Sequence, residues 1–120
     1  DRAPALAALQ EIIDRATVVG TTAELRINGE FLPLTATGAG EELLATYQAA
    51  AADAGLGLTG EFSGGCADSG FTAGVGCPTL CSVGPVGGKA HTAEEYLEVD
   101  SIVPRAQALA LAILRLPPAA

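Results

Sequence analysis

The chain has 120 residues, of which 49% are hydrophobic, and its 14 acidic against six basic side chains give a formal net charge of −8. A surplus of negative charge repels phosphate backbones and anionic lipid headgroups, which excludes nucleic acid and membrane surfaces as partners. The longest apolar run, residues 106–114 broken by Gln107, is far shorter than the ~20 residues that cross a bilayer. We therefore expect a soluble globular protein.

The three cysteines, Cys66, Cys77 and Cys81, are an odd number in apolar or glycine-rich surroundings. A small secreted protein pairs its cysteines in disulfides, so this pattern favours reduced, buried thiols and a cytoplasmic location. The sequence opens on Asp1 and contains no methionine, so we also expect the protein to have a segment upstream of it.

The first 36 residues predict a helix followed by a strand. Asp1 is suited to cap the helix, and apolar residues then recur at helical spacing as far as Ala16. Residues 22–28 alternate apolar and polar side chains, which is the period of a half-buried strand. Residues 31–40 are rich in turn-forming residues and predict a boundary between two units, which we place after residue 36.

Residues 37–120 predict an α/β unit. Its expected elements are a helix over 41–54, a strand over 56–62, a short helix from Asp68 or Ser69 to Gly76, a strand over 78–83 and a helix from an Asp100 cap to about Leu116. Alternating helices and strands are typical of a largely parallel sheet. Apolar residues cover most of the last helix, so we expect it to be buried on more than one side.

A glycine-rich loop over residues 84–96 carries the only histidine, His91, followed by Glu94 and Glu95. Glycines let backbone amides approach a ligand, an imidazole can bind a metal or move a proton, and a nearby carboxylate can orient that imidazole. This is the one stretch of the sequence whose residue types suit metal binding or proton transfer. On the residues alone, a lone loop histidine is more often solvated or structurally hydrogen-bonded than it is a metal ligand.

Several motifs follow one another in a fixed order: Gly64-Gly65, Asp68-Ser69-Gly70-Phe71, Gly76-Cys77-Pro78-Thr79-Leu80, Gly84-Pro85-Val86-Gly87-Gly88, His91-Thr92 and Glu95-Tyr96. In this order the chain resembles the C-terminal end of the zinc-dependent exopeptidase and deacylase family. That family includes carboxypeptidase G, aminoacylase, acetylornithine deacetylase and succinyl-diaminopimelate desuccinylase. The resemblance is dense over residues 60–116, and the chain corresponds to only the last third of a typical member.

The resemblance implies an α/β catalytic domain that binds two zinc ions, interrupted by an α+β lid domain that commonly mediates dimerisation. Residues 1–36 are expected to be the second half of the lid, and residues 37–120 the C-terminal part of the catalytic domain. Members hydrolyse a peptide or N-acyl bond next to a free carboxylate, with a zinc-activated water and a glutamate base. The glutamate is expected in the missing N-terminal part, so this chain should be inactive alone and should form a homo-oligomer.

The resemblance also assigns site residues. His91 matches a zinc ligand of the family, and the same loop offers Gly87, Gly88 and Lys89 as contacts for a small peptide or N-acyl amino acid substrate. Glu95 and Asp68 are expected to support the site as neighbouring carboxylates, although Asp68 is most simply a helix cap. The chain departs from the family where Glu30-Phe31-Leu32-Pro33-Leu34 replaces an arginine followed by prolines that grips the substrate carboxylate. Gly70 stands for the usual asparagine, and Lys89 stands where glycine is common.

A second reading belongs to a different class of protein. Cys66, Cys77, Cys81 and His91 can in principle supply the three thiolates and one imidazole of a structural zinc site. The chain would then be a small non-enzymatic interaction domain held together by its metal.

Overall fold

The computed structural model describes residues 2–15 and 17–118, and the chain divides into two compact units, Asp1–Glu30 and Phe31–Ala120. The division follows Glu30, ahead of the boundary predicted after residue 36. Within the described ranges, none of the helices has the length and apolar character needed to cross a membrane. The assignment of the first unit to half of a lid domain stays a prediction.

The first unit contains one helix, α1 (Arg2–Asp14), which confirms the predicted helix; the predicted cap Asp1 and the predicted last residue Ala16 lie outside the described residues. None of the described α1 residues is buried. An ion pair between Arg2 and Glu30 joins the start of the helix to the end of the unit. The strand predicted over 22–28 is extended backbone without a hydrogen-bonded partner strand, because the described part of this unit supplies no second strand.

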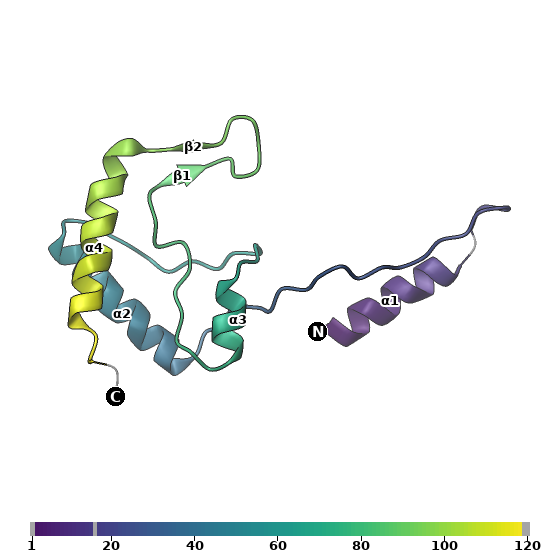
Figure 1. Ribbon diagram of the computed structural model, residues 1–120, viewed down its shortest axis with the longest axis horizontal. Helices are drawn as coiled ribbons and strands as arrows, with labels where there is room; N and C mark the ends of the chain where they lie inside the picture. The colour runs from purple at the N-terminus through teal and green to yellow at the C-terminus, as the bar shows by residue number, and fades with distance from the viewer. Residues whose placement is uncertain (1, 16, 119–120) are drawn as a thin grey trace. The chain divides into compact units, whose positions relative to one another are not determined.

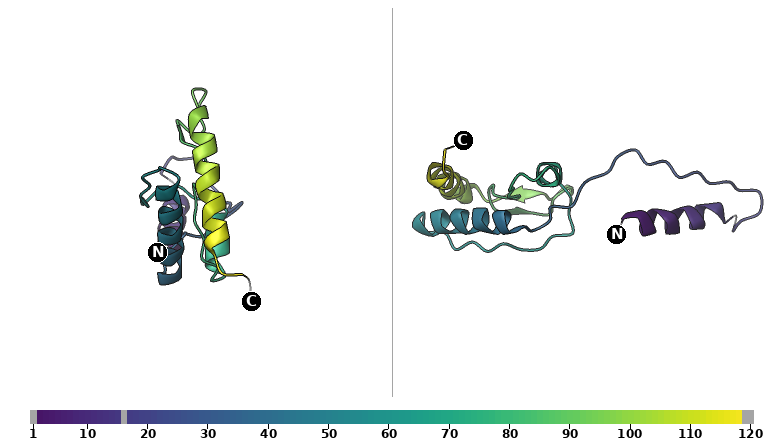
Figure 2. Two further views of the ribbon diagram at one scale, coloured as in Figure 1. Left: turned by 90° about the vertical axis from the view of Figure 1, so that its left-hand side faces the viewer. Right: turned by 90° about the horizontal axis from the view of Figure 1, so that it is seen from below.

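Two helices, α2 (Gly38–Asp53) and α4 (Ile102–Arg115), pack against each other and hold the core of the second unit (Figures 1 and 2). Because almost all the buried side chains are small, the two helices approach each other closely. The buried residues are Tyr47, Ala50, Ala51, Ala108 and Ala112. Helix α2 starts earlier than predicted because the Thr37 hydroxyl accepts a hydrogen bond of 3.1 Å from the amide of Gly40.

Two segments without regular secondary structure, residues 56–62 and 78–83, lie against these helices where strands were predicted. Leu56 and Leu58 from one segment, and Leu80 and Val83 from the other, pack on the helical core. The Tyr47 hydroxyl donates to the Val83 carbonyl at 3.2 Å. Neither segment is hydrogen-bonded into a sheet, so the predicted parallel sheet is wrong for the described residues: a ladder needs neighbouring strands, and these segments have none.

The described sheet is instead a two-stranded antiparallel pair, β1 (Gly87–Gly88) with β2 (Tyr96–Leu97). The second unit is thus a small helix-rich domain with a two-stranded sheet, which is compatible with a fragment of an α/β domain.

The short helix α3 (Ser69–Gly74) confirms the predicted helix and carries the segment 31–34 on its surface. A Cβ atom added to Gly70 would lie 1.7 Å from the carbonyl oxygen of Leu32, and one added to Gly74 would lie 2.8 Å from Leu32 Cδ1. Phe31 and Phe71 pair their rings beside this contact, with centroids 5.8 Å apart. The apolar residues that replace the family's arginine motif therefore pack on α3.

Helix α4 is covered on one side only, which corrects the expectation that it is buried on several. Ala108 and Ala112 face α2, whereas Val103, Ile113 and Leu114 are more than half exposed. The predicted cap Asp100 lies in a 3₁₀ turn, η1 (Val99–Ser101), that precedes α4, and Ser101 occupies the cap position.

Candidate metal-binding hairpin

The β1–β2 hairpin brings together five of the six predicted site residues, Gly87, Gly88, Lys89, His91 and Glu95, in strand β1 and the loop that follows it (Figure 1). The strands pair Gly87 with Leu97 and Gly88 with Tyr96. The loop from residue 89 to residue 95 therefore presents His91 near its tip, and the side chain of His91 is exposed.

The two glycines of β1 have a packing role that the sequence did not suggest. A Cβ atom on Gly87 would lie 2.6 Å from the carbonyl oxygen of Tyr96, and one on Gly88 would lie 2.9 Å from the Tyr96 ring and hydroxyl. Both distances are below any ordinary Cβ contact, so glycine is needed for β2 and the Tyr96 side chain to close over β1. Their predicted contact with substrate stays a prediction.

The loop backbone turns through two residues in the left-handed region, Lys89 with φ of 54° and His91 with φ of 66°. This conformation is costly for residues that carry a Cβ atom, so hydrogen bonds must hold it. Thr92 supplies two, because its amide and hydroxyl both donate to the Lys89 carbonyl, at 3.2 and 2.8 Å. The Thr92 carbonyl in turn accepts from the amide of Glu95 at 3.2 Å.

The Glu95 carboxylate reaches back across the loop to the histidine. Its Oε2 atom accepts a hydrogen bond of 3.3 Å from the backbone amide of His91. Glu95 therefore contacts the main chain of the predicted metal ligand.

The base of the hairpin is fastened to the start of α4 by two side chains that sequence reasoning missed. The Ser101 hydroxyl accepts from the amide of Val86 at 2.9 Å and donates to the carbonyl of Glu98 at 2.6 Å, while the Glu98 amide donates to Val86 at 2.8 Å. Arg105 donates from Nε to the Gly84 carbonyl at 2.6 Å. A serine and an arginine in the first turns of a helix carry no signal in sequence that they bind a distant loop.

Arg105 also donates from Nη2 to the carbonyl of Ser82 at 3.2 Å. Ser82 has a φ of 58°, so the guanidinium spans a strained turn at the entry to β1. Together with Ser101, Arg105 ties the hairpin to the start of α4.

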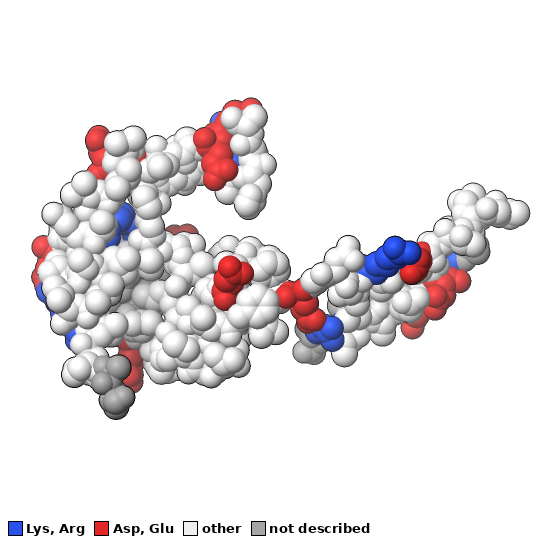
Figure 3. Space-filling model, in the orientation of Figure 1, with Lys and Arg blue, Asp and Glu red and all other residues white. Residues whose placement is uncertain are grey.

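The tip of the hairpin combines charges of both signs. Figure 3 shows acidic atoms at the hairpin, where Glu94 and Glu95 lie, on a surface that is otherwise mostly uncharged. Lys89 is exposed, and its ammonium group makes no ion pair with any residue that the structure describes. The loop thus exposes the ammonium of Lys89 beside the imidazole of His91.

Asp68, the remaining predicted site residue, lies at the start of α3 and not in the hairpin. Its backbone occupies the cap position, but its side chain accepts no capping hydrogen bond, so the predicted capping role is wrong. The backbone at Asp68 is already helical, with φ of −59° and ψ of −20°, whereas a capping side chain normally needs an extended backbone. Asp68, Glu95 and His91 do not form a common metal-binding cluster among the described residues.

The alternative structural zinc site is not formed. All three cysteines are free and exposed, which also corrects the expectation that they are buried: they lie in segments without regular secondary structure, outside the helical core. Across residues 2–15 and 17–118, no three side chains of His, Cys, Asp or Glu come together in a way that could hold a metal ion.

Hydrogen bonds from Ser69 and from Ser82 lower the pKa of the Cys81 thiol.

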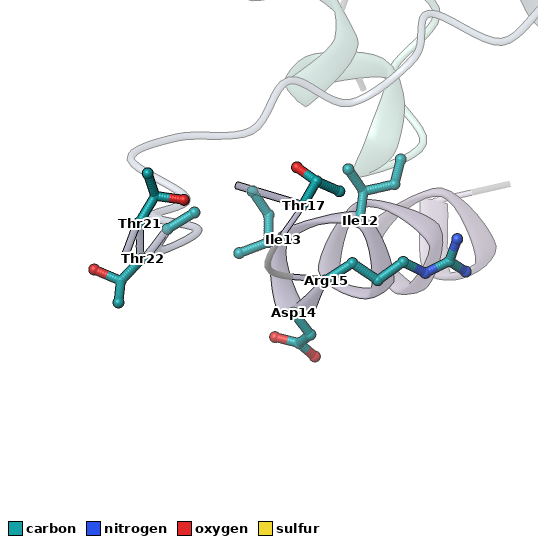
Figure 4. Close-up of a pocket in the computed structure, with 8 residues that line it drawn as sticks. Ile12, Ile13, Asp14, Arg15, Thr17, Thr21 and Thr22 are labelled. Atoms are coloured by element: carbon teal, nitrogen blue, oxygen red, sulfur yellow. The ribbon is translucent and has the colours of Figure 1, made fainter. Parts of the chain in front are cut away.

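The hollows of the surface do not coincide with the hairpin. One in the first unit has a volume of about 330 Å³ and lies between the end of α1 and the turn after it; Figure 4 labels Ile12, Ile13, Asp14, Arg15, Thr17, Thr21 and Thr22 around it. Another, of about 390 Å³, lies between Asp53 at the end of α2 and Leu114 in α4. Neither of these two is lined by a predicted site residue.

Comparison with known proteins gives one match. The model of peptidase family M20/M25/M40 matches residues 4–115, which include the hairpin, both anchoring side chains and most of α1. No curated protein and no solved structure matches the chain.

Proposed function

Because the chain belongs to peptidase family M20/M25/M40, a family of metal-dependent hydrolases, we propose that it is the C-terminal portion of a metallopeptidase or N-acyl-amino-acid amidohydrolase. The intact enzyme would cleave an amide bond next to a free carboxylate. The observation that carries this proposal is His91, exposed near the tip of a hairpin fixed at its base and lying within the family match.

The described residues do not fit a complete metal site. A zinc ion in a protein takes three or four ligands, and no three candidate ligands cluster in the part of the chain that the structure describes. His91 can supply one ligand of a site whose other ligands, and whose general base, come from upstream residues. No hydrolytic step is therefore assigned to the chain by itself, and we propose that it is inactive when isolated.

On the substrate side, Lys89 is our candidate for contact with the anionic end of a small peptide or N-acyl amino acid. Its ammonium lies two residues before His91 and has no intramolecular partner among the described acids. In the family that the chain resembles, an arginine followed by prolines usually binds the substrate carboxylate. In this chain apolar residues stand at that place, and residues 31–34 pack on α3. Gly87 and Gly88 complete the proposed contact by bringing backbone close to the substrate.

For the rest of the protein we propose a lid half over residues 1–36, a cytoplasmic location and a homo-oligomer. Exposed apolar side chains support association with another surface, either the upstream part of the protein or a second copy. They include Ile12 on α1 and Ile113 and Leu114 on α4, at 63%, 59% and 81% exposure.

The test compares wild-type and His91→Ala forms of the protein that includes its upstream part. Hydrolysis of a panel of N-acyl amino acids and C-terminal dipeptides should fall by at least about a thousandfold in His91→Ala, since one metal ligand is lost. Glu94→Ala is the matched control, because it alters the same loop at a side chain with no proposed role, and it should retain activity. Full hydrolysis by His91→Ala would refute the proposed role.

A further inference from the structure

We propose that Glu95 is a positioning residue that fixes the direction of the His91 side chain through the backbone amide of His91. This inference rests on the proposed role of His91 as a metal ligand. It assigns Glu95 a contact with the main chain of the ligand residue, in place of a contact with the imidazole or with the metal.

The first step is the backbone of His91 itself. A histidine with φ of 66° lies in the left-handed region, where a residue with a Cβ atom is held only if its surroundings compensate the cost. The direction of the Cα–Cβ bond follows from φ and ψ, so a return of His91 to a negative φ would turn its imidazole away from its present direction. The conformation of this one residue therefore decides where the proposed ligand points.

The second step is what holds that conformation. The hydrogen bonds of Thr92 fix the carbonyl of Lys89 and the amide of Glu95, and none of them involves the amide of His91. The Glu95 carboxylate is the acceptor for that amide, at 3.3 Å from Oε2. A carboxylate that accepts from a backbone amide makes a stronger bond than a neutral acceptor does.

The third step is the comparison with the neighbouring acid. Glu94 lies next to Glu95 and is also exposed; its amide donates to the Thr92 hydroxyl at 3.3 Å, but its carboxylate makes no hydrogen bond with the residues that the structure describes. The side chains of the two acids have the same chemistry and adjacent positions, and they differ in the contact with the amide of His91. Glu94 is a matched control for Glu95.

The chain has a single histidine, so the test needs only histidine labelled with ¹³C and ¹⁵N. Labelled wild-type chain and its Glu95→Ala, Glu95→Gln and Glu94→Ala variants would each give one backbone amide signal, from His91. We would measure the hydrogen exchange rate of this amide and the ¹³Cα and ¹³Cβ shifts that report a left-handed backbone. No metal is needed for this measurement.

In Glu95→Ala the His91 amide should exchange at least about five- to tenfold faster, and its carbon shifts should move towards values of a negative φ, because the acceptor is gone. Glu95→Gln keeps an acceptor oxygen and should stay within about threefold of wild type. Glu94→Ala should be unchanged. Unchanged exchange and shifts in Glu95→Ala would overturn the proposal, and so would a Glu95→Gln variant as perturbed as Glu95→Ala.

The hydrolytic activity of the protein with its upstream part gives a second readout. Glu95→Gln should retain most of the activity that Glu95→Ala loses, whereas a direct metal ligand or proton-transfer group would fail in both variants. An inactive Glu95→Gln enzyme would therefore overturn the positioning role. If His91→Ala proved fully active, the proposed function would fail, yet the labelled-histidine experiment would still decide whether Glu95 sets the backbone of His91.

Discussion

Replacing Gly70 by alanine should destabilise the second unit, although alanine is the better helix former. In a helix interior alanine gains about 1 kcal/mol over glycine. Against this, the new Cβ atom would lie 1.7 Å from the Leu32 carbonyl oxygen, about half of a normal contact, and backbone atoms cannot rotate away as a side-chain tip can. Segment 31–34 must then leave the surface of α3.

The cost of that displacement follows from what the segment covers. Leu32 is 40% exposed, so its remaining burial contributes roughly 1–2 kcal/mol, and the Phe31–Phe71 ring pair adds about 0.5–1 kcal/mol. After the gain in helix propensity, Gly70→Ala should lower the free energy of unfolding by about 0.5–2 kcal/mol.

Urea denaturation of the purified chain measures this value. Gly74→Ala is the control on the same helix, since its Cβ atom would meet only the movable Cδ1 of Leu32, at 2.8 Å, and it should leave stability unchanged or raise it by up to about 1 kcal/mol. A Gly70→Ala chain as stable as wild type, or more stable, would show that segment 31–34 does not lie on α3.

Three further predictions concern the hairpin and the thiol beside it. Lys89→Gly should raise the free energy of unfolding by about 0.5–1 kcal/mol, because glycine adopts the φ of 54° without strain, and Lys89→Ala, measured in the same urea titration, should give no such gain. Arg105→Ala should lower the free energy of unfolding by about 1–2 kcal/mol, because the carbonyls of Ser82 and Gly84 lose their donor. It should also speed the hydrogen exchange of the Glu98 amide at the base of the hairpin. Unchanged exchange would show that Arg105 does not hold the hairpin to α4. The lowered pKa of Cys81 gives this thiol a larger thiolate fraction than an ordinary cysteine has at the same pH. Iodoacetamide should therefore label Cys81 before Cys66 and Cys77. In Ser69→Ala, which lacks one of the hydrogen bonds that lower the pKa, this preference should be weaker.

Apolar residues at helical spacing, and prolines near the helix ends, made the helices predictable from the sequence. The apolar repeat after Asp1 predicts α1, the alanine-rich stretch predicts α2, and Pro104 near the start with Pro117 after the end frames α4. The start of α2 was placed three residues late because Thr37, which is outside the apolar repeat, makes the cap.

The strands were predicted from local alternation, which indicates an extended backbone but says nothing about a partner. Residues 56–62 and 78–83 form no strand in the described chain, because a ladder depends on neighbours that local sequence does not specify, and Ser82 in the second stretch has a φ of 58° that is not extended. The β1–β2 pair was missed for the opposite reason: its strands are two residues each, too short to show any period.

The site was predictable as a list of residue types but not as an arrangement. The glycines, histidine and glutamate of one loop predicted a site within residues 87–95. The left-handed conformation of His91, and the contact of Glu95 with the amide of His91, are properties of the folded loop that the residue types do not specify. Ser101 and Arg105 escaped prediction because their partners lie 15 to 23 residues away in sequence.

The metal content of the protein with its upstream part tests the central claim most directly. After gel filtration in metal-free buffer, the wild-type protein should retain about two zinc ions per chain, and His91→Ala should lose at least one of them because one protein ligand is gone. Equal zinc content in the two proteins would contradict the claim that His91 is a ligand contributed by this chain to a larger metal site.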